Sequence, residues 1–407
     1  MADRALPLAG VRVLDCSRVL AGPFATMLLA DLGADVVKLE PPDGDESRGW
    51  GPPFWGDPAD RVSAYFASVN RNKRSIVVDL RTDGGRDLLD LLASRSDLLV
   101  HNARPSSADR LGLGADRLAE RHPDLVVAAV GGFAVAGASA ERPAYDLLAQ
   151  AVTGLMAVTG EPSGPPMKVG VALLDLLAGL ELAVGALAAL LAVERRGRRL
   201  GQGSQVDGGH GSRIEVALVE AGVSSLINVL ANLVAGGEEP RRYGNAHPNI
   251  VPYEVFATAD GHVALAVGND AQFARLVSAL SVGADERFAT NAGRLAHRDV
   301  LVAIIGAAVA ERSRDDVLTA LLDADVPAGP VNSVSEALAM MEAQQGGGWL
   351  QEAGTARLAP NPIWIDGERP SIREPPPHLG EHTQAVLFEA GLEGAQIAAL
   401  RASGVVA

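Results

Sequence analysis

Val11-Arg-Val-Leu-Asp15 is the stretch that decides the fold, together with the two segments that follow it. Its apolar residues predict a strand, and Gly22-Pro23 opens a predicted amphipathic helix that ends near Gly33. Ala34-Asp-Val-Val-Lys-Leu39 then predicts a second strand. A strand, a helix and a strand in this order form the unit from which parallel sheets are built.

The same alternation continues along the first third of the chain. Further strands are predicted at Ser75–Leu80, Leu98–His101 and Leu125–Val130, with helical segments such as Gly85–Ala93 between them. This pattern predicts an α/β fold with a mostly parallel sheet and helices on both faces. The first turn, Ser17–Pro23, lacks the Gly-x-Gly-x-x-Gly spacing, which disfavours an enzyme that uses nicotinamide or flavin.

Composition excludes several classes of function. The chain has 407 residues and a formal net charge of −15, which argues against nucleic acid or an anionic membrane as the main partner. Its length suggests two domains. Cys16 is the single cysteine and lies in an apolar run, so we expect a core residue and no intrachain disulfide. The N-terminus resembles no secretory signal, and we predict a cytoplasmic protein without a metal site.

The second half of the chain predicts a smaller unit. Arg195–Ser212 is rich in Gly and Arg and predicts a surface loop, after which a helical pattern resumes over Arg213–Leu233. Strands are predicted near Tyr253–Ala257 and His262–Val267, followed by three helical stretches up to about Asp323.

Asp175 is a lone carboxylate in the apolar stretch Val169–Leu180. Burying a charge without a partner costs several kcal/mol, roughly, so such a residue is kept only if something compensates it or uses it. One interpretation is that Asp175 carries the chemistry. The other is a helix N-cap, because the residues after it predict a helix that runs to about Arg195. The two are compatible. The apolar stretch Leu176–Val193 contains Glu181 and predicts a buried helix rather than a membrane span.

Several motifs resemble those of family III CoA-transferases, the formyl-CoA transferase type, over nearly the whole chain. They are Gly10–Pro23, Leu32–Pro41, Asn70–Ser75, Asp109–Gly112, Pro143–Gln150, Gly160–Pro162, Gly244–Pro248 and Gly380–Thr383. The resemblance implies a Rossmann-like large domain with a parallel sheet, a smaller inserted α+β domain and an interlocked homodimer. We expect residues 1–224 and 326–407 in the large domain and 225–325 in the small one.

The resemblance also implies the activity, which is transfer of CoA between an acyl-CoA thioester and a small free carboxylic acid. In the family the catalytic aspartate stands where Asp175 does, and it forms an aspartyl anhydride and then an aspartyl-CoA thioester without a metal. Tyr145 and Asp146 are possible supporting residues, although Asp146 could equally be the N-cap of a helix over Leu147–Met156. For CoA itself the resemblance indicates residues along the carboxyl ends of the first strands: Val19, Lys38, Asn72, Lys73, Arg74, Asn102 and Arg110.

Two alternatives remain open at this stage. An α-methylacyl-CoA racemase of the same superfamily needs a second base where this chain has Tyr145, and a phenol with a pKa near about 10 is a poor base at neutral pH. A CoA-binding protein without turnover would keep the basic contacts and could dispense with Asp175. Leu20, Pro41 and Ala103 differ from the formyl-CoA enzymes, so the sequence does not identify the acids. It also offers no physical account of the insertion around Leu200–Gly211.

Overall fold

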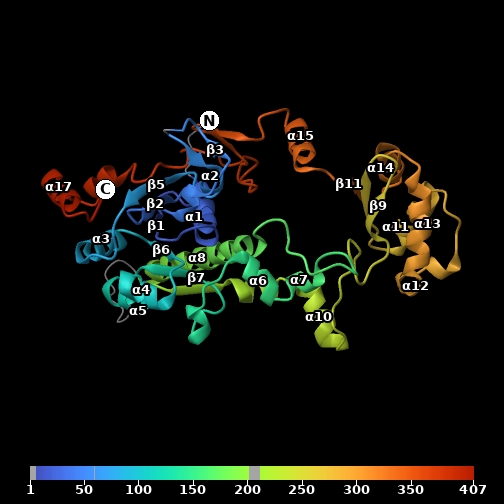
Figure 1. The fold of residues 1–407 in the computed structure, drawn as a ribbon, viewed down its shortest axis with the longest axis horizontal. Helices are drawn as coiled ribbons and strands as arrows, with labels where there is room; N and C mark the ends of the chain where they lie inside the picture. The colour runs from blue at the N-terminus through green and yellow to red at the C-terminus, as the bar shows by residue number, and fades with distance from the viewer. Residues whose placement is uncertain (1–5, 59, 201–210) are drawn as a thin grey trace. The chain divides into compact units, whose positions relative to one another are not determined.

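The computed structural model describes residues 6–58, 60–200 and 211–407. The chain forms two compact units (Figure 1). The first comprises Met1–Leu155, Val169–Leu230 and Gly348–Ala407, and the second comprises Met156–Lys168 and Ala231–Gly347. The small unit thus extends past the expected range of 225–325 at its carboxyl end and also takes in a segment that precedes Asp175.

A six-stranded sheet forms the centre of the large unit, in the order β5-β2-β1-β6-β7-β8. All five pairings are parallel, which confirms the predicted parallel α/β sheet. The chain winds from β1 toward β5 on one side and from β6 toward β8 on the other, so a crevice is expected at the carboxyl ends of β1 and β6. The strands are β1 (Arg12–Asp15), β2 (Asp35–Glu40), β5 (Lys73–Val77), β6 (Leu98–His101), β7 (Val126–Gly131) and β8 (Arg213–Ala217).

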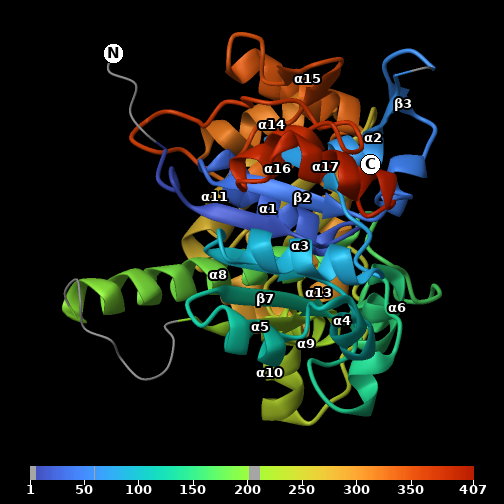
Figure 2. The ribbon, with the colours of Figure 1, turned by 90° about the vertical axis from the view of Figure 1, so that its left-hand side faces the viewer.

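Helices cover both faces of this sheet (Figure 2). On one face α1 (Ala21–Asp31) and α8 (Leu173–Leu200) bury small residues such as Ala25, Ala178 and Ala186 against the strands. The other face carries larger aliphatic side chains from α3 (Asp83–Ala93), α4 (Pro105–Leu111), α5 (Ala115–Arg121), α16 (Thr383–Glu389) and α17 (Gly394–Ala402). Small side chains let α1 and α8 approach closely, and this matters for the site below.

The rest of the large unit consists of short elements. The C-terminal segment returns to the sheet edge, where His382 N–H donates to the Ser75 carbonyl over 2.9 Å. The elements are η1 (Glu46–Gly49), β3 (Phe54–Trp55), β4 (Val62–Ser63), α2 (Ala64–Ala67), η2 (Ala138–Glu141), α6 (Asp146–Val152), α9 (Leu218–Ser224), β12 (Gln351–Ala353) and β13 (Ala356–Leu358). Helix α10 (Ile227–Gly236) begins in this unit and continues into the other, and α7 (Leu155–Val158) does the same.

The small unit is an α+β structure with an antiparallel sheet in the order β11-β10-β9. The prediction of a strand over Tyr253–Ala257 is confirmed residue for residue by β9, and β10 (His262–Ala266) ends one residue early. Its core joins the sheet to helices through Phe256, Leu276, Ile305 and Leu321. The other elements are α11 (Asp270–Ala279), η3 (Glu286–Phe288), α12 (Asn291–Ala296), α13 (Arg298–Ala310), α14 (Arg314–Asp323), β11 (Ala328–Pro330) and α15 (Val334–Gln344).

Two sequence predictions in the middle of the chain are wrong. The helix expected over Arg213–Leu233 begins with the edge strand β8, because Arg213-Ile-Glu-Val-Ala217 alternates polar and apolar residues and pairs with β7. The loop expected from Arg195 is helical up to Leu200, where α8 ends. Residues 201–210, the core of the unexplained insertion, lie outside the described residues.

Helix α8 is long and apolar enough, over Leu173–Arg196, to cross a membrane by length and composition, and α9 with α10 could count as a second, bent span. Core helices of soluble proteins pass the same test. One face of α8 is indeed buried, through Leu174, Ala178 and Leu182. The prediction of a buried helix thus holds for this face of α8, and 33% of the apolar window is buried.

Candidate active site

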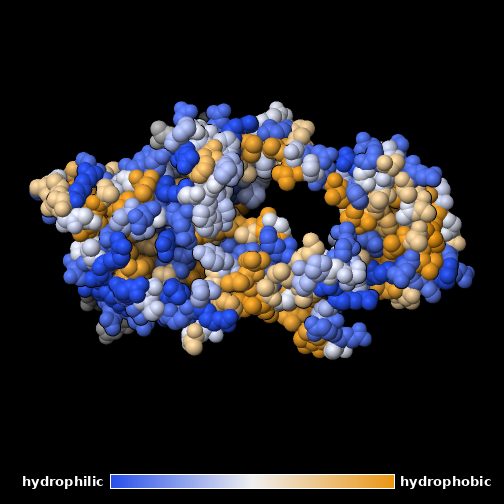
Figure 3. Space-filling model, in the orientation of Figure 1, coloured by the Kyte–Doolittle hydropathy of each residue, from blue (hydrophilic) through white to orange (hydrophobic). Residues whose placement is uncertain are grey.

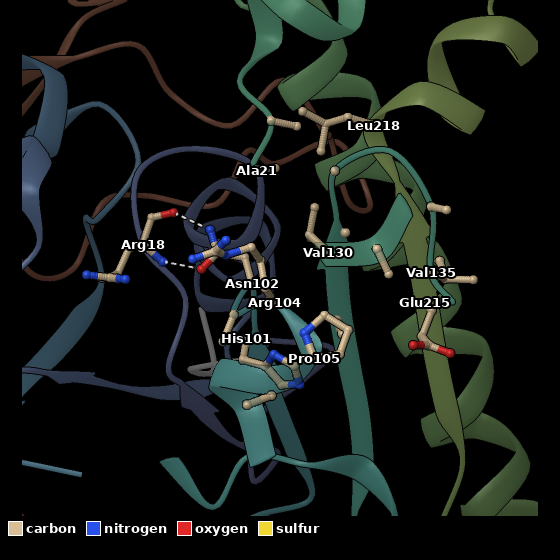
Figure 4. A pocket seen from close by; sticks show the side chains of 18 of the residues that line it. Arg18, Ala21, His101, Asn102, Arg104, Pro105, Val130, Val135, Glu215 and Leu218 are labelled. Atoms are coloured by element: carbon tan, nitrogen blue, oxygen red, sulfur yellow. Dashed lines mark hydrogen bonds between the residues drawn. The ribbon is translucent and has the colours of Figure 1, made fainter. Parts of the chain in front are cut away.

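A cavity of about 430 Å³ opens at the carboxyl ends of β1, β6 and β7 (Figure 4). Three loops form its walls: Arg18–Ala21 after β1, His101–Pro105 after β6, and Gly131–Val135 after β7. Asp175, from the first turn of α8, also lines the cavity, as do Arg142–Tyr145 and residues of α4, α5 and β8. The cavity therefore lies at the position where a doubly wound sheet is expected to bind ligands.

Asp175 stands at the cavity in an environment that disfavours its charge. Burial, and secondly the nearby carboxylate of Asp146, raise the pKa of Asp175 from 3.8 to about 7. Helix α8 begins two residues earlier, at Leu173, so the interpretation of Asp175 as an N-cap is wrong. Its carboxyl group is left available for chemistry near neutral pH.

Asp146 holds the start of α8 instead. Its Oδ1 accepts a hydrogen bond from the backbone N–H of Leu174 over 2.8 Å, and its Oδ2 accepts one from Gln150 Nε2 over 2.7 Å. Gln150 in turn accepts from the backbone N–H of Val169 over 2.8 Å through Oε1. Asp146 is the first residue of α6, so its expected role as the N-cap of that helix is wrong, and it caps α8 in the manner of an N-terminal carboxylate.

Two tyrosines belong to this region, and the sequence singled out only one. Tyr145 lines the cavity and is 55% exposed. Tyr65, in α2, is half-buried, and its pKa rises to about 12 through burial first and then through the charges of Asp175, Asp146 and Asp45. The Tyr65 phenol therefore stays protonated as a hydrogen-bond donor among these carboxylates. No motif marked Tyr65, because it comes from a short helix far from Asp175 in sequence.

The turn after β1 is held by side chains from two neighbouring loops. Asn102 clamps it from the β6 loop: its Oδ1 accepts from the Arg18 N–H over 3.0 Å, and its Nδ2 donates to the Arg18 carbonyl over 2.8 Å (Figure 4). Asp45 accepts from the Val19 N–H over 3.1 Å. Val19 and Asn102 thus lie at the cavity wall, where they were expected.

Two of the expected CoA-binding cations are enclosed by the protein. The Lys38 ammonium pairs with Asp45 over 3.0 Å and donates to the Ser17 carbonyl over 2.8 Å. The Lys73 ammonium pairs with Asp15 over 3.0 Å, and burial lowers the pKa of Lys73 to about 8 although Asp15 opposes that shift. Neither side chain lines the cavity. Both ammonium groups are paired with carboxylates inside the protein. Sequence spacing does not reveal these partners.

The expected placement at the carboxyl ends of the strands is wrong for Asn72, Lys73 and Arg74. Lys73 and Arg74 open β5, and Asn72 precedes it, so they lie toward its amino end. Arg74 is ion-paired with Asp35 over 2.7 Å and with Glu389 over 2.8 Å. Asn72 binds the Asp31 carboxylate over 2.7 Å. Arg110 lies in α4, bonds to Ser107 over 3.3 Å and does not line the cavity.

Four cationic side chains that no sequence motif indicated also line the cavity: Arg18, Arg104, Arg142 and Arg213. Arg142 lies over the Phe133 ring, with 3.7 Å from its guanidinium carbon to the ring centroid. Arg104 could have been found from its place just after a predicted strand, at the ligand-binding edge. His101 is buried beside them, and burial followed by the charge of Arg213 lowers its pKa to about 4, so it is neutral. Among the described residues no cluster of three metal-ligating side chains occurs.

A family model described as "CoA-transferase family III" matches residues 8–383. The chain belongs to CoA-transferase family III. This CoA-transferase is 40% identical to the succinate–glutarate CoA-transferase of Agrobacterium fabrum, over 96% of this chain and 97% of that protein. It is 36% identical to succinyl-CoA:glutarate CoA-transferase of Mus musculus, over 95% and 87% of the two chains.

Solved structures agree with this assignment. A CAIB/BAIF family protein from Brucella suis is 37% identical to this CoA-transferase, with a TM-score of 0.82 over 95% of this chain and all of that one. Rv3272 from Mycobacterium tuberculosis is 28% identical, with a TM-score of 0.80 over 94% and 99% of the chains. The prediction of a family III CoA-transferase is therefore confirmed.

Proposed function

We propose that the enzyme moves CoA between two small dicarboxylic acids by covalent catalysis at Asp175. The observation that carries the proposal is a carboxyl group with a pKa of about 7 at the sheet-edge cavity. A desolvated carboxylate is a stronger nucleophile than a hydrated one, and it can be ionised at neutral pH in about half of the molecules.

The reaction needs four transfers. An ionised Asp175 oxygen attacks the thioester carbon, the C–S bond breaks, and CoA thiolate leaves a mixed anhydride behind. The thiolate attacks the aspartyl carbon, the first acid departs as its carboxylate, and an aspartyl-CoA thioester remains. The acceptor carboxylate attacks that thioester carbon, and the released thiolate then attacks the acceptor's acyl carbon. Each step exchanges one acyl bond for another, so no metal, ATP or net proton transfer is required.

The nucleotide end of CoA requires local positive charge, because the whole protein is acidic. We propose that Arg18, Arg104 and Arg142 meet its phosphates, since all three line the same cavity as Asp175. Guanidinium groups suit this task because they bind phosphate oxygens through two parallel hydrogen bonds. Asn102 acts by fixing the Arg18 backbone. Lys38 and Lys73, which have internal partners, are not part of this set.

The names of the relatives support dicarboxylates as substrates. Two relatives are called succinate or succinyl-CoA enzymes acting with glutarate. Another, at 36% identity over 94% of this chain, is the acetyl-CoA:oxalate CoA-transferase of Acetobacter aceti. We therefore propose succinyl-CoA as a donor and glutarate as an acceptor. A homodimer stays part of the proposal on the strength of the family resemblance, and a cytoplasmic location on the strength of the single cysteine.

The test mixes succinyl-CoA with isotopically labelled glutarate and follows labelled glutaryl-CoA by mass spectrometry. The full-length enzyme is expected to form it, and Asp175→Ala to lose at least about a thousandfold in rate, as expected on removal of a covalent nucleophile. Hydroxylamine added during turnover should trap Asp175 as its hydroxamate. Asp323→Ala, at the exposed end of α14, serves as the control. Full activity of Asp175→Ala would remove the proposal, and α-proton exchange in deuterated water without glutaryl-CoA would favour a racemase.

A further inference from the structure

Val19 adopts a backbone conformation that its side chain disfavours. Its φ is 70°, in the left-handed region, where a β-branched residue is rare and strained. It stands in the cavity wall, between Arg18 and Leu20. Such a conformation persists only where the surroundings impose it, so the contacts of this turn need an account.

Two buried charges impose it. The Val19 N–H donates to Asp45 Oδ2 over 3.1 Å, and the same oxygen pairs with the Lys38 ammonium over 3.0 Å. Lys38 also donates to the Ser17 carbonyl over 2.8 Å. The Lys38–Asp45 ion pair therefore binds the backbone of the turn on both sides of Arg18. Both charged side chains are fully buried. Burial alone would raise the pKa of Asp45, but Lys38 and the bonds from Ser47 outweigh it and hold that pKa below its usual range.

The gripped turn lies next to the nucleophile. It leads directly into α1, whose start at Leu20 carries no side-chain cap, so its first N–H groups are left for a ligand or water. A Cβ built on Gly179 would lie 2.6 Å from the Ala21 carbonyl oxygen. Gly179 is one helical turn after Asp175 and on the same face of α8, so the start of α1 borders the site of Asp175. Ala21 and Asp175 both line the cavity.

We propose that Lys38 and Asp45 are positioning residues for the acyl-transfer reaction. They lock the Val19 turn so that the uncapped backbone N–H groups at the start of α1, into which the turn leads, stand ready where an oxyanion develops beside Asp175. The inference rests on the proposed function. It gives Lys38 a role that differs from contact with CoA: a buried cation that acts through Asp45 on the backbone. Preorganised donors of this kind stabilise the transition state more than the bound substrate.

We call the contacts of Asp45 Oδ2 with the Lys38 ammonium and the Val19 N–H the clamp. Asp45→Asn removes the clamp oxygen and keeps the side chain's hydrogen bond to the Ser47 N–H. An asparagine keeps Oδ1, which caps η1 by accepting from the Ser47 N–H. Its NH₂ group faces the Lys38 ammonium, which is also a donor, and leaves the Val19 N–H only its longer contact of 3.3 Å with Oδ1. In the full-length enzyme we expect kcat to fall about 10- to 100-fold, in line with a displacement of about 1 Å in an active site. KM for succinyl-CoA should stay within about threefold, because the proposed cations are untouched.

Two variants make the test specific. Ser47→Ala removes the hydroxyl hydrogen bond to Asp45 Oδ1 but keeps the bond from the Ser47 N–H to that oxygen. It leaves Oδ2, which binds Lys38 and the Val19 N–H, untouched, so its kcat should match the wild type. Glycine adopts positive φ without help, so Val19→Gly should make the turn less dependent on Asp45. The kcat of the double variant Val19→Gly/Asp45→Asn should therefore reach at least about a third of the kcat of Val19→Gly alone. Urea unfolding of every variant shows whether the variants remain folded at the assay temperature. A rise in KM with unchanged kcat, or equal losses in Ser47→Ala, would overturn the proposal.

A readout independent of turnover separates this proposal from the proposed function. Amide hydrogen exchange of peptides covering residues 17–21 should be slow in the wild type and at least about tenfold faster in Asp45→Asn, with Ser47→Ala unchanged. If the wild type transfers no CoA, the proposed function fails while the exchange result still reports the clamp. If exchange over residues 17–21 is unaffected by Asp45→Asn, the clamp is refuted whatever the activity.

Discussion

If Asp175 is the nucleophile, as we propose, its buried carboxyl group sets the pH range of the reaction. Its pKa is about 7, because burial first and the charge of Asp146 second disfavour ionisation. Only the ionised form attacks a thioester, so the rate of acyl-enzyme formation is expected to rise with pH through about 7 and level off above it. Single-turnover measurements with succinyl-CoA between about pH 5.5 and 9 would record this limb.

Asp146→Asn tests the second cause separately. It removes the neighbouring negative charge but keeps an oxygen for the Leu174 N–H. The rising limb should therefore move to lower pH, by less than the full distance to 3.8, because burial remains the larger cause. A limb that stays in place or moves upward would show that Asp146 does not act on Asp175 through its charge. Asp109→Asn, a second cavity-lining carboxylate that does not act on the pKa of Asp175, gives the matched charge control.

Burying Asp175 also lowers the free energy of unfolding at neutral pH. The unfolded chain ionises it near 3.8 and the folded protein only near 7, so stability is lost as pH rises between these values, by up to about 4 kcal/mol. Below the lower value both states are protonated and the difference vanishes. Asp175→Asn should therefore be more stable than the wild type at about pH 8 and nearly equal to it at about pH 4. Urea unfolding at both pH values checks this, and equal stability at the higher pH would contradict the shifted pKa.

At the scale of elements, the close approach of α1 and α8 sets the distance between the nucleophile and the turn after β1. Gly179→Ala places a methyl group 2.6 Å from the Ala21 carbonyl oxygen and 3.0 Å from the Phe24 ring. Backbone cannot yield as a flexible side chain does, so we expect a loss of about 1–3 kcal/mol in unfolding free energy and a lower kcat. Urea unfolding and steady-state kinetics measure the two effects.

Gly306→Ala is the control for helix propensity. Gly306 lies inside α13, and an added Cβ meets only a Phe256 ring atom at 4.0 Å. Alanine there should stabilise the protein by about 0.5–1 kcal/mol. If Gly179→Ala were also stabilising and fully active, the two helices would not be held at contact distance.

Helices and strands could be predicted where the local sequence pattern determines them. They could not be predicted where pairing with a distant segment determines them. β9 and β6 were predicted with their bounds, because alternation or a short apolar run between turns is sufficient. β8 was missed because a strand at the sheet edge that leads straight into α9 has a pattern close to that of a continuing helix. Lys38 shows the same limit at the site: a cation in the sequence does not reveal that Asp45 encloses it.

At the scale of the whole molecule, the candidate active site gathers residues that are distant along the chain. Its walls come from loops after β1, β6 and β7, and Asp175 enters from a helix that follows the segment of the small unit at Met156–Lys168. The family resemblance indicated Asn102 and Asp175, and both line the cavity. The sequence could not place Tyr65 or Arg142, because their neighbours depend on how loops order in space.

The large unit leaves an unusually apolar surface exposed. Along α8, Leu180, Val184 and Leu191 face outward at helical spacing, with Val184 67% exposed. Exposed apolar side chains also occur on α6 and α10, such as Leu147 and Ile227, and Figure 3 shows orange atoms at the surface over these helices. A stripe of this kind usually marks a surface that another protein covers.

Val184→Glu tests whether a second copy covers it. If the enzyme is a homodimer through this stripe, an unpaired carboxylate there should weaken the dimer at least about a hundredfold, because the charge loses its water without gaining a partner. Sedimentation velocity over a range of micromolar concentrations would show the shift from dimer to monomer. Val334→Glu, at the exposed start of α15, should leave the dimer intact. A wild type that sediments as a monomer, or a Val184→Glu variant that stays dimeric, would mean that this stripe is not the contact between copies.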